Sequence, residues 1–166
     1  GLIDSCIMWL INVVWSIPTL LLVIAITLVL GKGVFQVFIA VGLTMWVEVA
    51  RIVRGQILSI REKEFVEAGR ALGFSDARII FKHVLPNVMG PVLVLATIQV
   101  ATAIIIEATL SFLGVGAPPT SPSLGSLIQE GNKFLFSGEW WITVFPGLML
   151  LAISLSVNLL GDRVRD

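Results

Sequence analysis

The chain has 166 residues, of which 57% are hydrophobic and 13% charged, with a mean hydropathy of +0.99 and a formal net charge of zero. Ordinary soluble domains carry roughly 25% charged residues, so much of this surface is expected to face lipid. The neutral balance excludes a nucleic-acid partner at the level of the whole chain, and the single cysteine, Cys6, excludes an internal disulfide.

Long uncharged runs dominate the sequence. A transmembrane helix needs about 20 apolar residues, because the hydrocarbon core is roughly 30 Å thick and a helix rises about 1.5 Å per residue. Residues 6–30, 87–106 and 140–161 reach this length, and residues 33–50 form a fourth candidate interrupted only by Glu48. The sequence therefore predicts an all-α integral membrane chain with about four transmembrane helices.

Pro18 interrupts the first run. A proline inside a helix lacks an N–H donor, and its ring clashes with the preceding turn. We therefore expect an interfacial piece over about residues 3–16 and a span over about residues 17–30. Because the first residue is Gly and no signal-peptide pattern precedes this run, we also expect the chain to begin within a longer protein.

The basic residues indicate an orientation. Seven of the eleven lie between residues 51 and 82 and two close the chain, whereas Lys32 and Lys133 are left for the other loops. Cytoplasmic loops of membrane proteins carry an excess of Lys and Arg, so we expect residues 51–85 and the C-terminus to be cytoplasmic. Residues 114–139 are then an extracytoplasmic loop, which could cover a pathway, meet an external partner or simply connect two spans.

The cytoplasmic segment 61–86 predicts two short helices joined by a sharp turn. Gly73 suits the left-handed conformation that ends a helix, and Ser75 is a favourable N-cap for the second helix, which Pro86 is expected to end. Apolar residues recur at helical spacing along the first helix, at Phe65, Ala68 or Gly69, and Leu72.

A projecting hairpin of this kind suits insertion into a groove on another protein. Two charged and two small positions are candidates for that contact, namely Glu67, Arg70, Ala68 and Gly69. The Lys and Arg content equally suits a loop that rests on anionic lipid headgroups, so periodicity alone leaves both readings open.

The order of residues in this hairpin resembles a known signature. Glu67-Ala68-Gly69, Gly73, His83 and Leu85-Pro86 stand at the spacing of the EAA motif of ABC importer permeases, E-A-A-x3-G-x9-I-x-L-P. Gly69 replaces the second Ala, and His83 replaces Ile, as is common in the peptide-importer branch. Residues 107–114 and 158–166 are also similar to the second, C-type permease of dipeptide, oligopeptide and nickel importers.

The resemblance implies a set of partners. Residues 1–166 would be a permease domain, incomplete at the N-terminus and equivalent to the C-terminal four spans of a six-span protein of the prokaryotic plasma or inner membrane. It would pair with a homologous permease subunit, two cytoplasmic ATPase subunits and an extracytoplasmic substrate-binding protein. Its ATPase-coupling residues would be Glu67, Ala68, Gly69, Arg70, Gly73, Leu85 and Pro86.

We expect no catalytic site, metal site or cofactor in the chain itself. It lacks the G-x-x-x-x-G-K-[ST] phosphate loop, so ATP and Mg would lie on the partner ATPase subunits. A single histidine, His83, does not build an imidazole metal site. A non-ABC channel or a structural membrane protein would explain the spans but not the motif. An intramembrane enzyme would need a catalytic constellation within the spans.

Four polar residues within the predicted spans are candidates for a structural or functional role. We expect Glu48 to form an i, i+3 ion pair with Arg51. Glu107 could be protonated, bonded to a neighbouring helix, or exposed to a pathway, and structural stabilisation is at least as well supported as substrate contact. Ser154 and Asn158 share a face rich in small residues, so they are candidates for helix packing or for lining a pathway.

Overall fold

The computed structural model describes residues 1–118 and 120–165, and within them the chain is helical with no strand. Pro119 of the predicted outer loop and Asp166 of the C-terminal resemblance lie outside the described residues. A π-helical turn, η1 (Ile80–Val84), joins α5 to α6, and a 3-10 turn, η2 (Leu135–Ser137), lies between α7 and α8. The α-helices are α1 (Leu2–Trp15), α2 (Thr19–Leu30), α3 (Val34–Arg61), α4 (Glu64–Ala71), α5 (Asp76–Ile79), α6 (Leu85–Phe112), α7 (Leu124–Asn132) and α8 (Trp141–Arg165).

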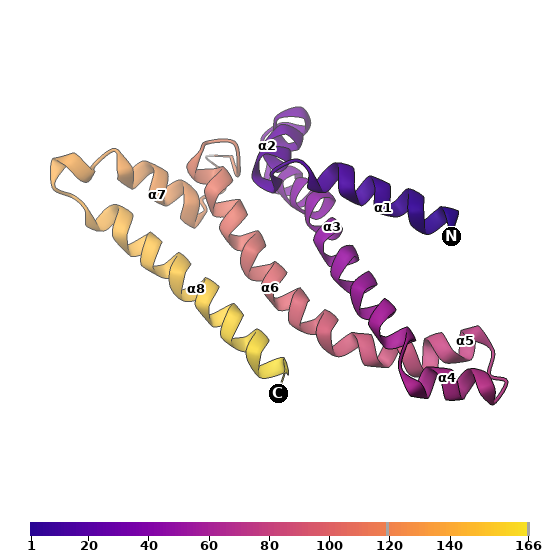
Figure 1. Ribbon diagram of the computed structural model, residues 1–166. Coiled ribbons are helices and arrows are strands. Elements are labelled where there is room, and N and C mark those ends of the chain that lie inside the picture. The colour runs from indigo at the N-terminus through magenta and orange to yellow at the C-terminus, as the bar shows by residue number, and fades with distance from the viewer. Residues whose placement is uncertain (119, 166) are drawn as a thin grey trace.

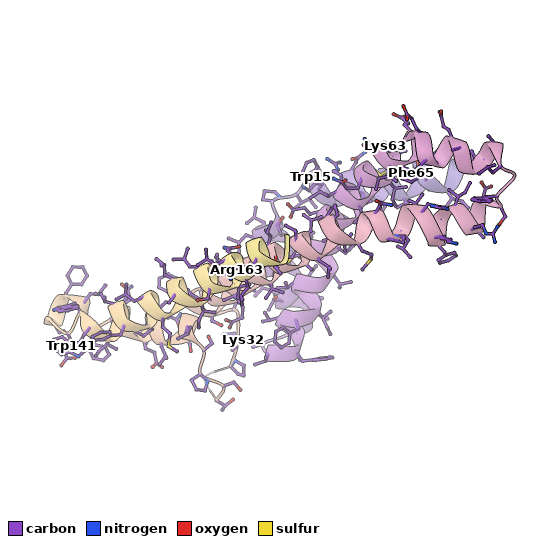
Figure 2. All side chains as sticks on the ribbon, turned by 90° about the horizontal axis from the view of Figure 1, so that it is seen from below. Trp15, Lys32, Lys63, Phe65, Trp141 and Arg163 are labelled. Atoms are coloured by element: carbon purple, nitrogen blue, oxygen red, sulfur yellow. The ribbon has the colours of Figure 1, made fainter. Side chains whose placement is uncertain are left out.

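Three continuous helices among the described residues are long and apolar enough to cross a membrane: Val34–Arg61, Asp76–Phe112 and Trp141–Gly161. The pair α1 and α2 makes a fourth span if a break is allowed, so the prediction of about four spans is confirmed. The α4–α5 hairpin and the last turn of α8 lie at one end of these helices, and the α2–α3 turn and α7 lie at the other (Figure 1). We call these the hairpin end and the loop end. Figure 2 shows Phe65 and Trp141 toward opposite ends of the elongated molecule.

The first predicted span is broken at Pro18, as expected. Helix α1 ends at Trp15, α2 begins at Thr19, and the two helices are bent by 89°. The 12 residues of α2 correspond to about 18 Å, little more than half of the hydrocarbon core. This helix packs against the first half of α3, whereas α1 lies across the second half.

Polar contacts hold α1 against the hairpin-end half of α3. Two nitrogens of Arg54 donate hydrogen bonds to the two carboxylate oxygens of Asp4, each at 2.8 Å. Arg51 donates to the side-chain oxygen of Asn12, and its guanidinium carbon lies 3.6 Å from the centre of a Trp15 ring. Exposed ion pairs stabilise proteins weakly, so these contacts orient α1 more than they stabilise the fold.

The predicted ion pair between Glu48 and Arg51 is wrong. Gln99 of α6 donates a hydrogen bond of 3.4 Å to Glu48, and Arg51 bonds to α1 instead. In the described parts of the chain, the one salt bridge is that between Arg54 and Asp4. The i, i+3 rule considers a single helix, whereas α1 offers Arg51 an amide oxygen and an indole face from outside that helix.

The second arm of the hairpin continues into α6 without a break. Residues Asp76–Phe112 form one helical rod of 37 residues, so the prediction that Pro86 ends a helix is wrong. The turn η1 precedes Pro86, and within it the N–H of Leu85 bonds to the carbonyl of Ile80, five residues back. The wider π turn shifts the carbonyls that the proline ring would otherwise meet, so the rod accommodates Pro86 with the loss of one N–H donor.

Two apolar clusters join the helices, one at each end. The loop-end cluster combines α2, α3 and α6 through the buried residues Val23, Val37, Ala40, Val41 and Leu110. The hairpin-end cluster combines the hairpin with α6 through the buried residues Val66, Ile79, Val84 and Val88. Val53 and Ile60 of α3 pack against the second cluster. Helices α3 and α6 are therefore connected by apolar packing near both of their ends.

The segment between α6 and α8 packs against both of these helices. Ser123 and Ser126 exchange hydrogen bonds in a capping box that begins α7. Gly125 lies against the backbone of Ala108 in α6, and Gly131 lies against the start of α8. The segment thus contains a nine-residue helix that is packed between α6 and α8.

We expect the Gly125→Ala substitution to destabilise the packing of α7. A Cβ atom at this position would lie 2.7 Å from the Cα of Ala108 and closer still to its carbonyl oxygen. Overpacking of this kind costs about 1–3 kcal/mol, so the thermal unfolding midpoint of the detergent-solubilised protein should fall. Gly147→Ala in α8 is the matched control, because a Cβ there meets no atom within 4 Å. An equal loss of stability in both variants would contradict this packing.

Candidate functional site

The turn at the tip of the α4–α5 hairpin closes with two backbone hydrogen bonds. The N–H of Phe74 donates to the carbonyl of Gly69 at 3.0 Å, and the N–H of Gly73 donates to the carbonyl of Arg70 at 2.9 Å. Gly73 has φ of +75°, and the Ser75 hydroxyl accepts a hydrogen bond from the N–H of Arg78 in the first turn of α5. The predicted left-handed glycine and the predicted N-cap are both confirmed, and together they set the angle between the two arms.

The inner face of the hairpin is apolar and closed. Val66 and Ile79 are 1% and 4% exposed, and Phe74 packs against the same cluster. This cluster extends directly to Val53 of α3 and to Val88 of α6. Because protein interiors are close-packed and resist deformation, the hairpin and the adjoining ends of α3 and α6 are expected to move together.

An aromatic stack borders this cluster. The rings of Phe74 and His83 are nearly parallel, at 8°, with centres 6.1 Å apart, and the Phe65 ring lies 6.4 Å from His83. The guanidinium of Arg78 lies 5.0 Å from the centre of the Phe74 ring. His83 therefore fills the apolar position of the motif with a flat ring that stacks on Phe74 and lies tilted against Phe65. This packing role was not expected from the sequence, although the exchange of Ile for His at position 83 was a signal for it.

The outer face of α4 carries an exposed apolar stripe. Phe65, Ala68 and Leu72 are all exposed, with Leu72 exposed by 72%. Glu67 and Arg70 are exposed on the same short helix. The predicted stripe thus exists and is free to meet another molecule.

The remaining predicted coupling residues are divided between the two faces. Gly69 is buried against Phe74 and Ile79, so the expectation that it lets a partner approach closely is wrong. Leu85 and Pro86 are exposed at the junction of the hairpin with α6. Ala68 is the small residue that the outer face presents.

The two candidate residues of α8, Ser154 and Asn158, differ in burial. Ser154 is buried, and it lies on the face that also carries Gly147 and Gly161. Gly161 is close to the Thr97 side chain of α6, as expected for helices that approach through small residues. Asn158 is exposed, so the structure does not place it beside Ser154 on the packed face.

Glu107 lies near the loop end of α6, where its surroundings are both polar and open. The Ser111 hydroxyl donates a hydrogen bond of 2.7 Å to Oε1 of Glu107, and the N–H of Ala117 donates to that hydroxyl at 3.2 Å. Glu107 also lines a cavity of about 480 Å³ between α3, α6 and the segment after α6. The hydrogen-bond partner is on its own helix rather than on the neighbouring helix that the sequence analysis considered.

The chain matches known proteins along almost its entire length. Residues 1–165 match the family described as binding-protein-dependent transport system inner membrane component. The whole chain is 40% identical to the oligopeptide transport system permease protein OppC of Bacillus subtilis (strain 168), of which it covers 54%. It is also 40% identical to the dipeptide transport system permease protein DppC of the same organism, of which it covers 52%.

The chain is similar to a third relative to about the same degree. Over 98% of its length the chain is 42% identical to a putative peptide transport system permease protein of Brucella suis biovar 1, covering 55% of that protein. The chain thus spans about half the length of the curated relatives that it matches.

We expect Gly69→Ala to stabilise the hairpin. A Cβ there would lie 3.4 Å from Phe74 and 3.8 Å from Ile79, both ordinary contacts, and Ala is better than Gly in a helix by about 0.5–1 kcal/mol. The midpoint of thermal unfolding should rise slightly. Gly69→Leu is the matched comparison, because the closed inner face has no room for a large side chain, and it should lower the midpoint. A less stable Gly69→Ala variant would refute this description of the inner face.

Proposed function

The chain belongs to the family of binding-protein-dependent transport system inner membrane components, and on that premise we propose that it is the permease part of an ATP-driven ABC importer. It is a multi-pass membrane protein of the inner-membrane type. The relatives named above as oligopeptide and dipeptide permeases favour di- and oligopeptides as the transported substrates over a related substrate such as nickel.

The observation that carries this proposal is the two-faced hairpin. Its inner face, through Val66 and Ile79, belongs to one cluster with the ends of α3 and α6. Its outer face presents Phe65 and Leu72. A partner that holds the outer face can therefore displace two membrane-spanning helices together, because the packed cluster transmits the displacement. A loop that only rested on lipid would not require this connection.

The partners follow from this division of the hairpin. We assign the exposed stripe of α4 to a groove on a cytoplasmic ATPase subunit, with Glu67 and Arg70 as charged contacts beside it. ATP and Mg would be bound by a pair of such subunits, and a homologous permease would lie beside this one. A substrate-binding protein would dock at the loop end. The permease then acts as a two-state element whose equilibrium its partners shift.

The assigned orientation predicts opposite labelling of two exposed positions. In a Cys6→Ser background, Ser137→Cys at the loop end should react with a membrane-impermeant thiol reagent in intact cells, and Ala77→Cys in the hairpin should react only after permeabilisation. Both residues are exposed, so access to the thiol depends on the side of the membrane alone. The reverse pattern would refute the cytoplasmic hairpin.

We expect Gly73→Val to uncouple the transporter without preventing its insertion. A β-branched residue strongly disfavours the positive φ of this position, so the α4 stripe would be misplaced relative to the ATPase groove. Peptide uptake by the complete transporter should fall at least tenfold, and ATPase subunits should co-purify less or lose stimulation by the loaded binding protein. Membrane levels should stay near those of the wild type.

Gly73→Asn provides the matched control for this experiment. Asn tolerates the left-handed conformation, whereas Val does not. A Cβ at position 73 meets no atom within 4 Å in either variant, so the two variants differ in backbone preference and not in steric collision at Cβ. Gly73→Asn should therefore retain most uptake. Wild-type uptake with intact ATPase association in Gly73→Val would remove the hairpin from the coupling mechanism.

A further inference from the structure

The loop-end cavity combines a wide apolar lining with one acid. Its walls come from the first half of α3, the second half of α6 and the segment that precedes α7. Among the residues that the structure describes, Glu107 is the one charged residue in this lining, and Ser121 and Ser123 add hydroxyl groups. The volume of about 480 Å³ lies within the range of small-molecule sites, roughly 300–1,000 Å³.

The Glu107 carboxylate is held in a defined position. Ser111 is 2% exposed and donates its one hydroxyl proton to Oε1. The N–H of Ala117 in turn donates to the Ser111 oxygen, which ties the carboxylate to the segment that closes the cavity. Oε1 is thus committed to the protein, whereas Oε2 remains able to accept a hydrogen bond from a ligand.

We propose that this cavity binds the terminal ammonium group of a short peptide, with the Glu107 carboxylate as its anionic partner and the apolar walls as the site for the first side chains. An ammonium group is a compact cation with three hydrogen-bond donors, which one carboxylate and neighbouring hydroxyls can satisfy. One carboxylate with two hydroxyls is a poor donor set for a nickel ion, which prefers nitrogen or sulfur ligands. The inference rests on the proposed peptide import and names the group on the permease that contacts the substrate.

Thiol labelling inside the cavity tests the charge directly. The complete transporter, reconstituted with Cys6→Ser and Ser121→Cys in this chain, is treated with a cationic and an anionic methanethiosulfonate reagent of similar size. Clefts lined by one sign of charge raise the local concentration of counterions about tenfold or more. The cationic reagent should therefore react at least tenfold faster, relative to the same ratio at the remote position Ser137→Cys. Glu107→Gln, which keeps the acceptor for Ser111, should remove this preference.

Two controls make the result specific. Glu130→Gln removes an exposed carboxylate on α7 that does not line the cavity, and it should leave the preference unchanged. Trialanine should slow labelling at Ser121→Cys, N-acetyl-trialanine should not, and Glu107→Gln should abolish the protection by trialanine.

The outcomes separate this inference from the proposed function. Three results would overturn the ammonium site. The two reagents could label Ser121→Cys at equal rates whether residue 107 is Glu or Gln, or both peptides could protect the thiol equally. The thiol could also be inaccessible because lipid or a partner subunit fills the cavity. Any of these results combined with normal peptide uptake would leave the importer assignment standing. A charge preference and amine protection in a transporter that takes up no peptide would instead support the ammonium site and overturn peptide import.

Discussion

The apolar cluster at the hairpin end is the contact on which the arrangement of this chain depends. Val66 and Ile79 of the hairpin share it with Val84 and Val88, and Val53 and Ile60 of α3 complete it. Without this cluster α4 would be joined to the spans only through the chain at its two ends, and its exposed stripe would have no packed connection with α3 and α6. Two features support this contact. The positive φ of Gly73 brings the two arms of the hairpin together. The continuous rod from Asp76 to Phe112 carries the second arm into the membrane.

The two helices held by this cluster also form the walls of the loop-end cavity. Helix α3 contributes Val37 and α6 contributes Glu107, and the loop-end cluster packs the same helices against α2. A force on the hairpin and a ligand in the cavity would therefore act on the same pair of helices. Displacement of α6 would move Glu107 together with Ser111, whose hydroxyl also bonds to the segment that closes the cavity. This shared framework gives the proposed coupling a physical route, since packed cores tend to switch between discrete arrangements.

Several local features of the hairpin could be predicted because they depend only on neighbouring residues. Gly73 and Ser75 end one helix and begin the next through their own backbone and side-chain chemistry, and Pro18 breaks the first apolar run for the same reason. The prediction that Pro86 ends the second helix was wrong, because the π turn that accommodates it cannot be recognised from the residue pattern. The ion pair of Glu48 was also misjudged, because α1 supplies the competing partners of Arg51 from 36 or more positions away.

The helical fold and the approximate number of membrane-spanning segments could be predicted from composition and periodicity, which act within a few helical turns. The assignment of the short hairpin to a permease came instead from its resemblance to a known motif in the order and spacing of its residues. The folded chain was needed to show that Gly69 faces inward while Ala68 faces outward, and that the His83 ring stacks on Phe74 and lies tilted against Phe65. It also decided that Glu107 lines a cavity with α3. The physical reason is that which face of a helix is covered depends on the neighbours that pack against it, and those neighbours are distant in sequence.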